Sequence, residues 1–215
     1  LGLVGDGTAV AIGHIEEDKI VVDLVTQIKA GEGDYADKER LDFDDVADWV
    51  LSLSKKFYIV EGIFDQWAGI PFEQALAKRG LGQMKSTQMT RQITSNIFQN
   101  FKDMMWDERL RLYNTKNPEM NGHEPYIKEL LELQANVQSK HVVLVEAPQV
   151  QGKHDDMSDA LTRMVWLASQ KMGSQKYVTS AGGRSAGGYS GFSNGKGFAG
   201  GARLRAGSDA KRIPR

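Results

Sequence analysis

The sequence predicts an α/β fold, with one folded domain over residues 1–171 and a flexible basic tail over residues 172–215. Three observations support this prediction. A chain of 215 residues, of which 40% are hydrophobic, can bury one substantial core but has little room for two ordinary domains. The expected elements begin with strands, alternate between helix and strand, and end in a helix. From Met172 onward the composition changes abruptly to glycine, serine and basic residues.

Strands are expected where Val- and Ile-rich runs lie between glycines or charged clusters. Thr8–Ile15 and Lys19–Ile28 predict two adjacent strands joined by a short turn, and Leu1–Val4 predicts the end of an earlier strand. An apolar run predicts a buried strand at Phe57–Phe64, and a compact apolar run of strong β character predicts another strand at His141–Glu146.

Helices are expected where apolar residues recur at helical spacing. The predicted helices are Asp44–Ser54 with Asp42 as its N-cap, Phe72–Arg79 ended by Gly80, Thr90–Glu108, Pro125–Gln138 and Asp156–Lys171.

Charge is unevenly distributed along the chain. From Met172 onward there are eight Lys or Arg and one Asp, a balance of +7, so the formal net charge of −1 leaves −8 for residues 1–171. Eleven of the 23 glycines lie in the same C-terminal segment, together with Tyr189, Phe192 and Phe198. This composition predicts a tail that is disordered when free and suited to DNA contact, to docking on another protein or to a solubilising linker.

Several classes of protein are disfavoured by absences from the sequence. There is no cysteine, hence no disulfide framework or thiolate metal site. No apolar run approaches the length of a membrane helix and the start is unlike a signal peptide, so a soluble cytoplasmic protein is expected. No phosphate-binding Gly-x-x-x-x-Gly-Lys-Ser/Thr loop occurs, so ATP hydrolysis is not expected of this piece. Since the first residue is not Met, the chain is expected to begin inside a longer gene product.

Carboxylates lie at the ends of predicted core elements, where a rigid scaffold can bring them to one point. Asp6 follows the first apolar run, Asp65 ends the predicted strand Phe57–Phe64, and Asp155, Asp156 and Asp159 open the last predicted helix. Clustered like charges repel unless a cation is bound, and hard Mg²⁺ or Mn²⁺ ions prefer oxygen ligands. The pattern predicts a divalent-metal site.

Each acidic residue also has a structural explanation. Asp155 or Asp156 can cap a helix, and Asp6 between two glycines can shape a turn. Glu61 shares a strand face with Asp65 and is an alternative inward-facing carboxylate. Zinc is disfavoured because His14 and His154 lack paired ligand spacing.

Three sequence motifs together resemble the nuclease half of the large terminases of tailed bacteriophages. They are Gly5-Asp6-Gly7-Thr8-Ala9 leading into Ile12-Gly13-His14, then Phe64-Asp65-Gln66-Trp67, then His154-Asp155-Asp156-Met157-Ser158-Asp159-Ala160-Leu161. The resemblance spans roughly residues 1–167, and its most specific parts are the Asp-Gln-Trp strand end and the Asp-Asp-x-x-Asp-Ala helix start.

The resemblance implies a ribonuclease H-like fold, with a mixed sheet flanked by helices and two bound Mg²⁺ or Mn²⁺ ions. Asp65 matches the family's second catalytic acid, and Asp155 with Asp156 match the third, with Asp159 as an accessory carboxylate. Asp6 matches an acidic position downstream of the first catalytic acid. That first acid would fall just ahead of Leu1, so the chain departs from the family pattern here.

The resemblance further implies a function. The chain is expected to be a metal-dependent endonuclease that cleaves concatemeric viral double-stranded DNA during genome packaging, by two-metal phosphodiester hydrolysis in the cytoplasm of the infected host. The implied partners are the portal protein, the small terminase subunit and an ATPase motor domain upstream in the same polypeptide.

DNA binding is expected to depend on contacts between basic side chains and phosphates. The candidates around the predicted site are Lys78, Arg79, Lys85, Arg91 and Lys153, of which Lys153 lies closest in sequence to the acidic pair. Each of these side chains can instead simply solubilise a helix face.

Two other functions fit the same residues. One is a junction-resolving or ribonuclease H-type nuclease with a similar carboxylate site, because fold does not fix substrate. The other is a non-catalytic DNA-binding or assembly module whose acidic residues are only caps and surface charge.

Overall fold

The computed structural model describes residues 7–66, 69–116, 122–150 and 152–178. The predicted strand end at Leu1–Val4, Asp6 and the tail from residue 179 lie outside these ranges. The described elements are β1 (Thr8–Glu16), β2 (Lys19–Ile28), the 3-10 helix η1 (Gly33–Tyr35), α1 (Phe43–Ser54), β3 (Gly62–Asp65), α2 (Gly69–Lys78), β4 (Met84–Thr87), α3 (Arg91–Trp106), β5 (Leu110–Arg111), α4 (Pro125–Glu132), β6 (Gln134–Ser139), β7 (Val142–Glu146) and α5 (Asp156–Val178).

A long antiparallel hairpin, β1–β2, lies at the centre of the fold. Glu17 in its turn has a positive φ of 56°, and Glu16 pairs with Lys19 directly beside the turn. The pairing register shifts between Ile12 and Gly13, which pair with Leu24 and Val22, so Asp23 of β2 is the extra residue at this point. The two predicted strands and the turn between them are therefore confirmed.

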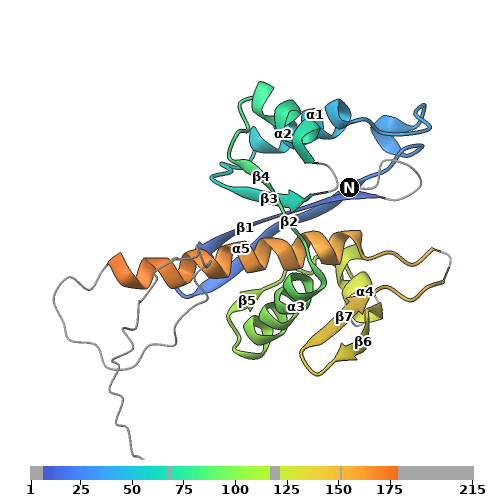
Figure 1. Cartoon of the computed structure of the whole chain (residues 1–215). Helices are drawn as coiled ribbons and strands as arrows, with labels where there is room; N and C mark the ends of the chain where they lie inside the picture. The colour runs from blue at the N-terminus through green and yellow to red at the C-terminus, as the bar shows by residue number, and fades with distance from the viewer. Residues whose placement is uncertain (1–6, 67–68, 117–121, 151, 179–215) are drawn as a thin grey trace, which may run out of the picture. The chain divides into compact units, whose positions relative to one another are not determined.

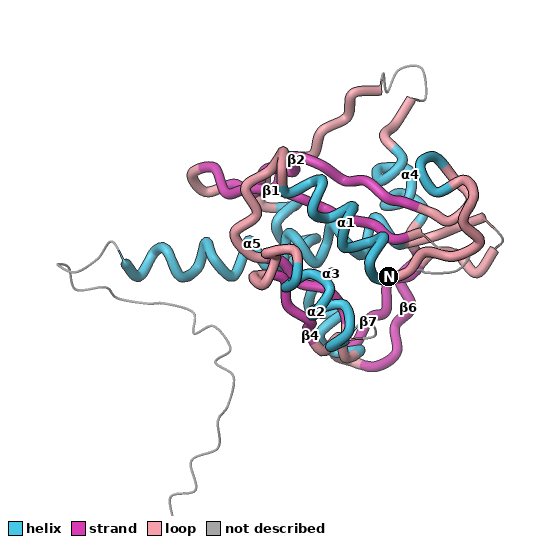
Figure 2. Tube along the Cα trace, turned by 90° about the horizontal axis from the view of Figure 1, so that it is seen from above, coloured by secondary structure: helices cyan, strands magenta, loops and turns pink. Residues whose placement is uncertain are grey.

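Helices cover both faces of this hairpin. Figures 1 and 2 show α1 and α2 on one face and α5, with α3 and α4, on the other. Strand alternation explains the two cores: Ala9 and Ala11 pack into the cluster on the α5 side, whereas Val10 packs into the cluster on the α1 and α2 side. The result is a helix–sheet–helix arrangement.

The core on the α5 side is the larger of the two clusters. Its buried members from β2, α3, α4 and α5 are Ile20, Val22, Val25, Phe101, Met104, Tyr126, Met157, Leu161, Val165 and Met172. At Gly13, β1 comes very close to α5, because a Cβ there would lie 2.7 Å from Met164 Sδ and 2.7 Å from the Val21 carbonyl oxygen. The absence of a side chain at Gly13 thus lets the hairpin and α5 pack together.

Local signals fix the helix ends. Asp42 caps α1 by accepting the Asp45 N–H at 2.8 Å, and the Asp45 side chain accepts the Asp42 N–H at 3.0 Å, which completes a capping box. Thr90 caps α3, because its side-chain oxygen accepts the backbone N–H of Ile93. Gly80, with a φ of 79°, follows the end of α2. These helices agree with the sequence prediction to within a few residues.

Two predicted elements were wrong in part. The strand expected at Phe57–Phe64 exists only at its end, because residues 57–61 are irregular and Tyr58 and Val60 are 94% and 73% exposed. The helix expected at Pro125–Gln138 ends at Glu132, and residues 134–139 instead pair with β7 as strand β6. Backbone pairing with β7 overrides helical spacing in this polar, exposed segment.

No helix of the described part is long and apolar enough to cross a membrane.

Candidate metal centre

Asp65 is the last residue of β3 and is held rigidly at the edge of a core. The strand runs parallel to β4 with Asp65 opposite Thr87. The preceding residue, Phe64, is buried and meets Phe72 of α2 edge to face, with ring centroids 5.0 Å apart. Asp65 itself is only 8% exposed. Asp65 is therefore a nearly buried carboxylate at the end of a strand whose preceding residue packs in the core.

The start of α5 is tied to two other parts of the fold through the predicted acidic pair. Asp155 Oδ2 accepts the backbone N–H of Ala147, which follows β7, at 3.1 Å. Asp156 Oδ2 accepts the backbone N–H of Gly7, which precedes β1, at 3.2 Å. Asp6 itself lies outside the described residues, although it is the sequence neighbour of Gly7.

Asp159 lies one turn further along α5. Burial raises its pKa to about 6; Arg163 opposes this shift, and the negative charges of Asp155 and Asp156 add to it. The charges of Asp155 and Asp156 therefore act on the carboxyl group of Asp159.

Arg163 links the two groups of acids. Its Nη2 donates to Asp159 Oδ2 at 2.7 Å, four residues away on the same helix, and its Nη1 lies 3.5 Å from Asp65 Oδ2. One guanidinium thus joins the end of β3 to the first turns of α5. The structure brings Asp65 and Asp159 to the same cation from elements far apart in sequence.

Glu129 supports the same end of α5 from α4. It is 7% exposed, and its Oε1 accepts the backbone N–H groups of Met157 at 3.1 Å and Ser158 at 3.4 Å. Burial raises its pKa to about 7; the two backbone hydrogen bonds oppose the shift, and the charges of Asp156 and Asp155 add to it.

The chemistry of these donors suits a hard divalent cation, because all the predicted ligands are carboxylate oxygens. As placed, however, no three His, Cys, Asp or Glu side chains among the described residues are close enough together to hold a metal ion. Two of the acids are engaged by Arg163 instead. The chemistry of the donor set nevertheless fits Mg²⁺ or Mn²⁺, and Asp6, another predicted ligand, lies outside the described residues.

The other residues considered in the sequence as possible ligands are His14, His154 and Glu61, and each has different surroundings. His14 Nδ1 lies 2.8 Å from Asp23 Oδ2 across the β1–β2 hairpin. His154 lines a polar pocket of about 530 Å³ formed by the segment between β7 and α5, which also includes Lys153, Asp155 and Asp156. Glu61 forms an ion pair with Lys171 at 2.5 Å, near the other end of α5, so it is not grouped with Asp65.

The basic candidates differ in their surroundings. Arg79 joins α2 to α1 through Asp44 at 2.8 Å and Asp48 at 2.6 Å, and these two hydrogen-bonded carboxylates raise its pKa further. Lys153 pairs with Glu132 at 2.5 Å. The remaining three, Lys78, Lys85 and Arg91, are exposed.

Lys85 and Arg91 lie on either side, in sequence, of Thr87, the residue of β4 that pairs with Asp65. Lys85 is in β4, two residues before the partner of Asp65, and Arg91 begins α3 just after that strand. The parallel pairing therefore places Lys85 opposite Ile63, two residues before Asp65, and Arg91 follows the partner of Asp65 by four residues.

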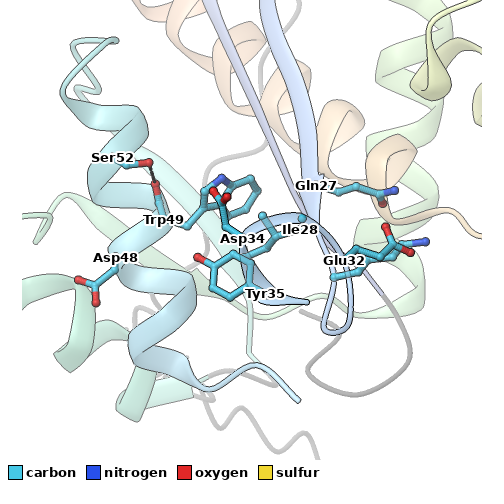
Figure 3. Close-up of a pocket in the computed structure, with 10 residues that line it drawn as sticks. Gln27, Ile28, Glu32, Asp34, Tyr35, Asp48, Trp49 and Ser52 are labelled. Atoms are coloured by element: carbon cyan, nitrogen blue, oxygen red, sulfur yellow. Dashed lines mark hydrogen bonds between the residues drawn. The ribbon is translucent and has the colours of Figure 1, made fainter. Parts of the chain in front are cut away.

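A second pocket, of about 430 Å³, lies between the end of β2 and α1. In Figure 3, Trp49 and Tyr35 lie over Ile28, while Gln27 and Glu32 point away from α1. Gln27 and Lys29 also flank Gly7, since a Cβ on Gly7 would lie 2.7 Å from Gln27 Oε1, 3.2 Å from Lys29 Cε and 3.3 Å from Asp156 Oδ2. The close packing around Gly7 thus brings the end of β2 beside Asp156.

Sequence reasoning did not identify Arg163, Glu129 or Lys29. Arg163 carried a usable signal, because Asp159 and Arg163 have ion-pair spacing on a predicted helix. Glu129 lies three residues after the buried Tyr126, on the same face of α4. Its role in capping another helix has no local sequence signature.

Solved structures share this fold at low sequence identity. The HK97 bacteriophage large terminase gives a TM-score of 0.59 at 13% identity, over 77% of this chain and 37% of that one. The large terminase nuclease from thermophilic phage G20c gives 0.51 at 12% identity, over 76% of this chain and 83% of that one. The same nuclease with bound cobalt gives 0.51 at 11% identity, over 77% and 84%.

These comparisons confirm the predicted ribonuclease H-like α/β fold and the predicted resemblance to large terminase nuclease domains at the level of the fold. The chain spans about 37% of the length of the HK97 protein. No protein-family model and no curated protein matches the sequence.

Proposed function

We propose that this chain is the nuclease part of a phage large terminase, a divalent-metal-dependent endonuclease that cuts concatemeric double-stranded DNA during genome packaging. The observation that carries the proposal is the joining of Asp65 at the end of β3 to Asp159 of α5 through Arg163. The fold in which this occurs is shared with a nuclease whose solved structures contain magnesium and cobalt.

Asp65, Asp155, Asp156 and Asp6 are the proposed metal ligands, with Asp159 as a supporting carboxylate. A bound pair of Mg²⁺ or Mn²⁺ ions would supply an activated water and stabilise the leaving oxygen of a phosphodiester. The protein itself would orient the carboxylate ligands. The N–H groups of Ala147 and Gly7 hold Asp155 and Asp156, and the buried strand before Asp65 fixes its carboxylate.

DNA binding is proposed to depend on phosphate contacts from exposed basic residues. Lys85 and Arg91 are the leading candidates because of their place near Asp65, followed by Lys78. Lys153 would have to release Glu132 to contact DNA, and Arg79 would have to release Asp44 and Asp48. The same proposal includes three partners, which are the portal protein, the small terminase subunit and an ATPase domain. It places the protein in the host cytoplasm.

Plasmid nicking in Mn²⁺ or Mg²⁺ tests the proposal directly. Cleavage by the wild-type chain should disappear in excess chelator and in Asp65→Asn and Asp156→Asn, because both substitutions remove a ligand charge. Asp103→Asn is the matched control, since Asp103 is exposed on α3 and its side chain accepts a hydrogen bond from Gln99 of the same helix. Activity that survives chelation would contradict metal dependence.

A substrate panel separates the related functions. Preference for linear duplex DNA over an RNA–DNA hybrid and a four-way junction supports the terminase function. Preference for the hybrid or junction would instead favour the ribonuclease H-type or junction-resolving alternative. DNA binding by a folded chain that nicks nothing in any divalent ion, including a version extended upstream of Leu1, would favour the non-catalytic binding module.

A further inference from the structure

Arg163 lies between two carboxylates that belong to different elements of the candidate metal centre. Its contact with Asp159 is short, at 2.7 Å, and stays within α5. Its contact with Asp65 is longer, at 3.5 Å, and crosses from α5 to β3. The planar guanidinium can face two carboxylates at once, which an ammonium group does less well. Arg163 is therefore paired first with Asp159 of its own helix, and Asp65 of β3 is its second, more distant partner.

We propose that Arg163 is an internal counter-ion that competes with the divalent metal for Asp65 and so sets the metal concentration at which the nuclease site assembles. This inference rests on the proposed function, because it assumes that Asp65 is a metal ligand.

Burial explains why a counter-ion is needed. The Asp65 side chain is 11% exposed, and a carboxylate that is withdrawn from water is costly unless a positive charge offsets it. The Arg163 side chain is itself only 21% exposed, so water screens this interaction less than it would on the surface. In the metal-free protein Arg163 supplies positive charge that a divalent cation would otherwise provide.

Competition follows from the position of the guanidinium. A divalent cation bound to Asp65 would bring two positive charges close to Nη1, and like charges at such separations repel strongly. The Arg163 contact with Asp65 must then lengthen or break. The shorter contact with Asp159 gives the guanidinium a place to remain.

The experiment compares Arg163→Gln with wild type in Mn²⁺ binding by calorimetry and in melting temperature with and without Mn²⁺. Removing the competing charge should tighten Mn²⁺ binding on the order of tenfold. The metal-free variant should melt at a lower temperature, and Mn²⁺ should raise its melting temperature by more than it raises that of wild type. Arg163→Lys keeps the charge but cannot face both carboxylates equally, so its Mn²⁺ affinity should lie between the two.

Arg111→Gln is the matched control. Arg111 is an exposed arginine of β5 that pairs with Glu16 at 2.6 Å, away from the candidate centre. Its Mn²⁺ affinity should equal that of wild type. Equal tightening in Arg111→Gln and Arg163→Gln would show a general effect of net charge and would overturn the inference. So would unchanged or weaker Mn²⁺ binding in a folded Arg163→Gln.

Asp65→Asn separates the inference from the proposed function. If Mn²⁺ binds wild type and not Asp65→Asn, but Arg163→Gln binds no more tightly, then the counter-ion role fails while the metal site stands. If Asp65→Asn binds Mn²⁺ as well as wild type does, then both the proposed metal site and the inference are overturned.

Discussion

The carboxylate of Glu129 in α4 accepts the backbone N–H of Met157, the second residue of α5, at 3.1 Å. The first N–H groups of a helix have no partner within the helix, so a buried helix start needs acceptors from elsewhere. Glu129 provides one for Met157 and for Ser158, directly after the acidic pair. The position of the proposed metal ligands on α5 thus depends on a residue of α4.

The buried Glu129 predicts a specific pH dependence of stability. Its pKa rises from 4.5 to about 7 on folding, so the folded state binds the proton more tightly than the unfolded state. The contribution is complete below about pH 4.5 and is lost as the pH rises through 7. The free energy of unfolding should therefore fall by up to about 3 kcal/mol across this window from this group.

Urea unfolding at pH 5 and pH 8 measures this effect. Glu129→Gln keeps an acceptor oxygen without the charge, so the fall between the two pH values should be smaller in the variant than in wild type. Glu39→Gln, at an exposed position before α1, should leave the fall unchanged. An identical pH dependence in wild type and Glu129→Gln would show that Glu129 is not protonated in the folded state at pH 5.

Gly13→Ala should destabilise the protein through overpacking. The new Cβ would lie 2.7 Å from a backbone oxygen, that of Val21, so relief requires movement of the hairpin and not only of Met164. The expected loss in the free energy of unfolding is about 1–3 kcal/mol. Gly82→Ala is the control, because a Cβ there meets nothing within 4 Å. Equal stabilities of the two variants would contradict the close approach of β1 and α5.

The capping box of α1 predicts that substitutions at Asp42 and Asp45 lower the free energy of unfolding in a non-additive way. Asp42→Ala removes the acceptor for the Asp45 N–H and should cost about 1 kcal/mol. Asp45→Ala removes the reciprocal bond and also the ion pair with Lys38. A double-mutant cycle in urea unfolding should give a double variant that loses less than the sum of the single losses. Strict additivity would mean that the two hydrogen bonds act independently.

Charge reversal at the proposed DNA face should weaken DNA binding. Lys85→Glu and Arg91→Glu should each reduce affinity most at low salt and lower the salt dependence by about one phosphate contact. Fluorescence anisotropy with duplex DNA, in an Asp65→Asn background that cannot cut, is the measurement. Lys102→Glu makes the same charge change at an exposed position in α3. An equal loss in Lys102→Glu would assign the effect to net charge.

Local patterns in the sequence were sufficient to predict the central hairpin and the capped helices. The Val- and Ile-rich runs of β1 and β2 form strands because both faces of the hairpin are buried. Asp42 and Thr90 mark helix starts because their side chains satisfy backbone N–H groups regardless of tertiary context. Acidic residues at the ends of core elements were likewise visible in the sequence.

Contacts between distant segments account for what the sequence did not predict. Met84–Thr87 lacks a strand pattern and forms β4 through parallel pairing with β3. Every residue of Gln134–Ser139 is exposed, and the segment becomes a strand through its pairing with β7. Residues 57–60 are apolar, yet Tyr58 and Val60 are exposed, so the composition of this segment was misleading. The roles of Glu129 and Arg163 depend on the approach of α4 and β3 to α5, which no local pattern encodes.

The burial of α5 has a consequence for when the protein becomes active. Leu161 and Val165 of this helix are completely buried, and α5 packs against β1, β2, β3, α3 and α4. Asp65 and Asp156 are 91 positions apart in the sequence. A growing polypeptide that has emerged from the ribosome only as far as β7 therefore lacks both a closed core and half of the proposed ligands. Under the proposed function, a partly synthesised enzyme cannot damage the viral DNA around it.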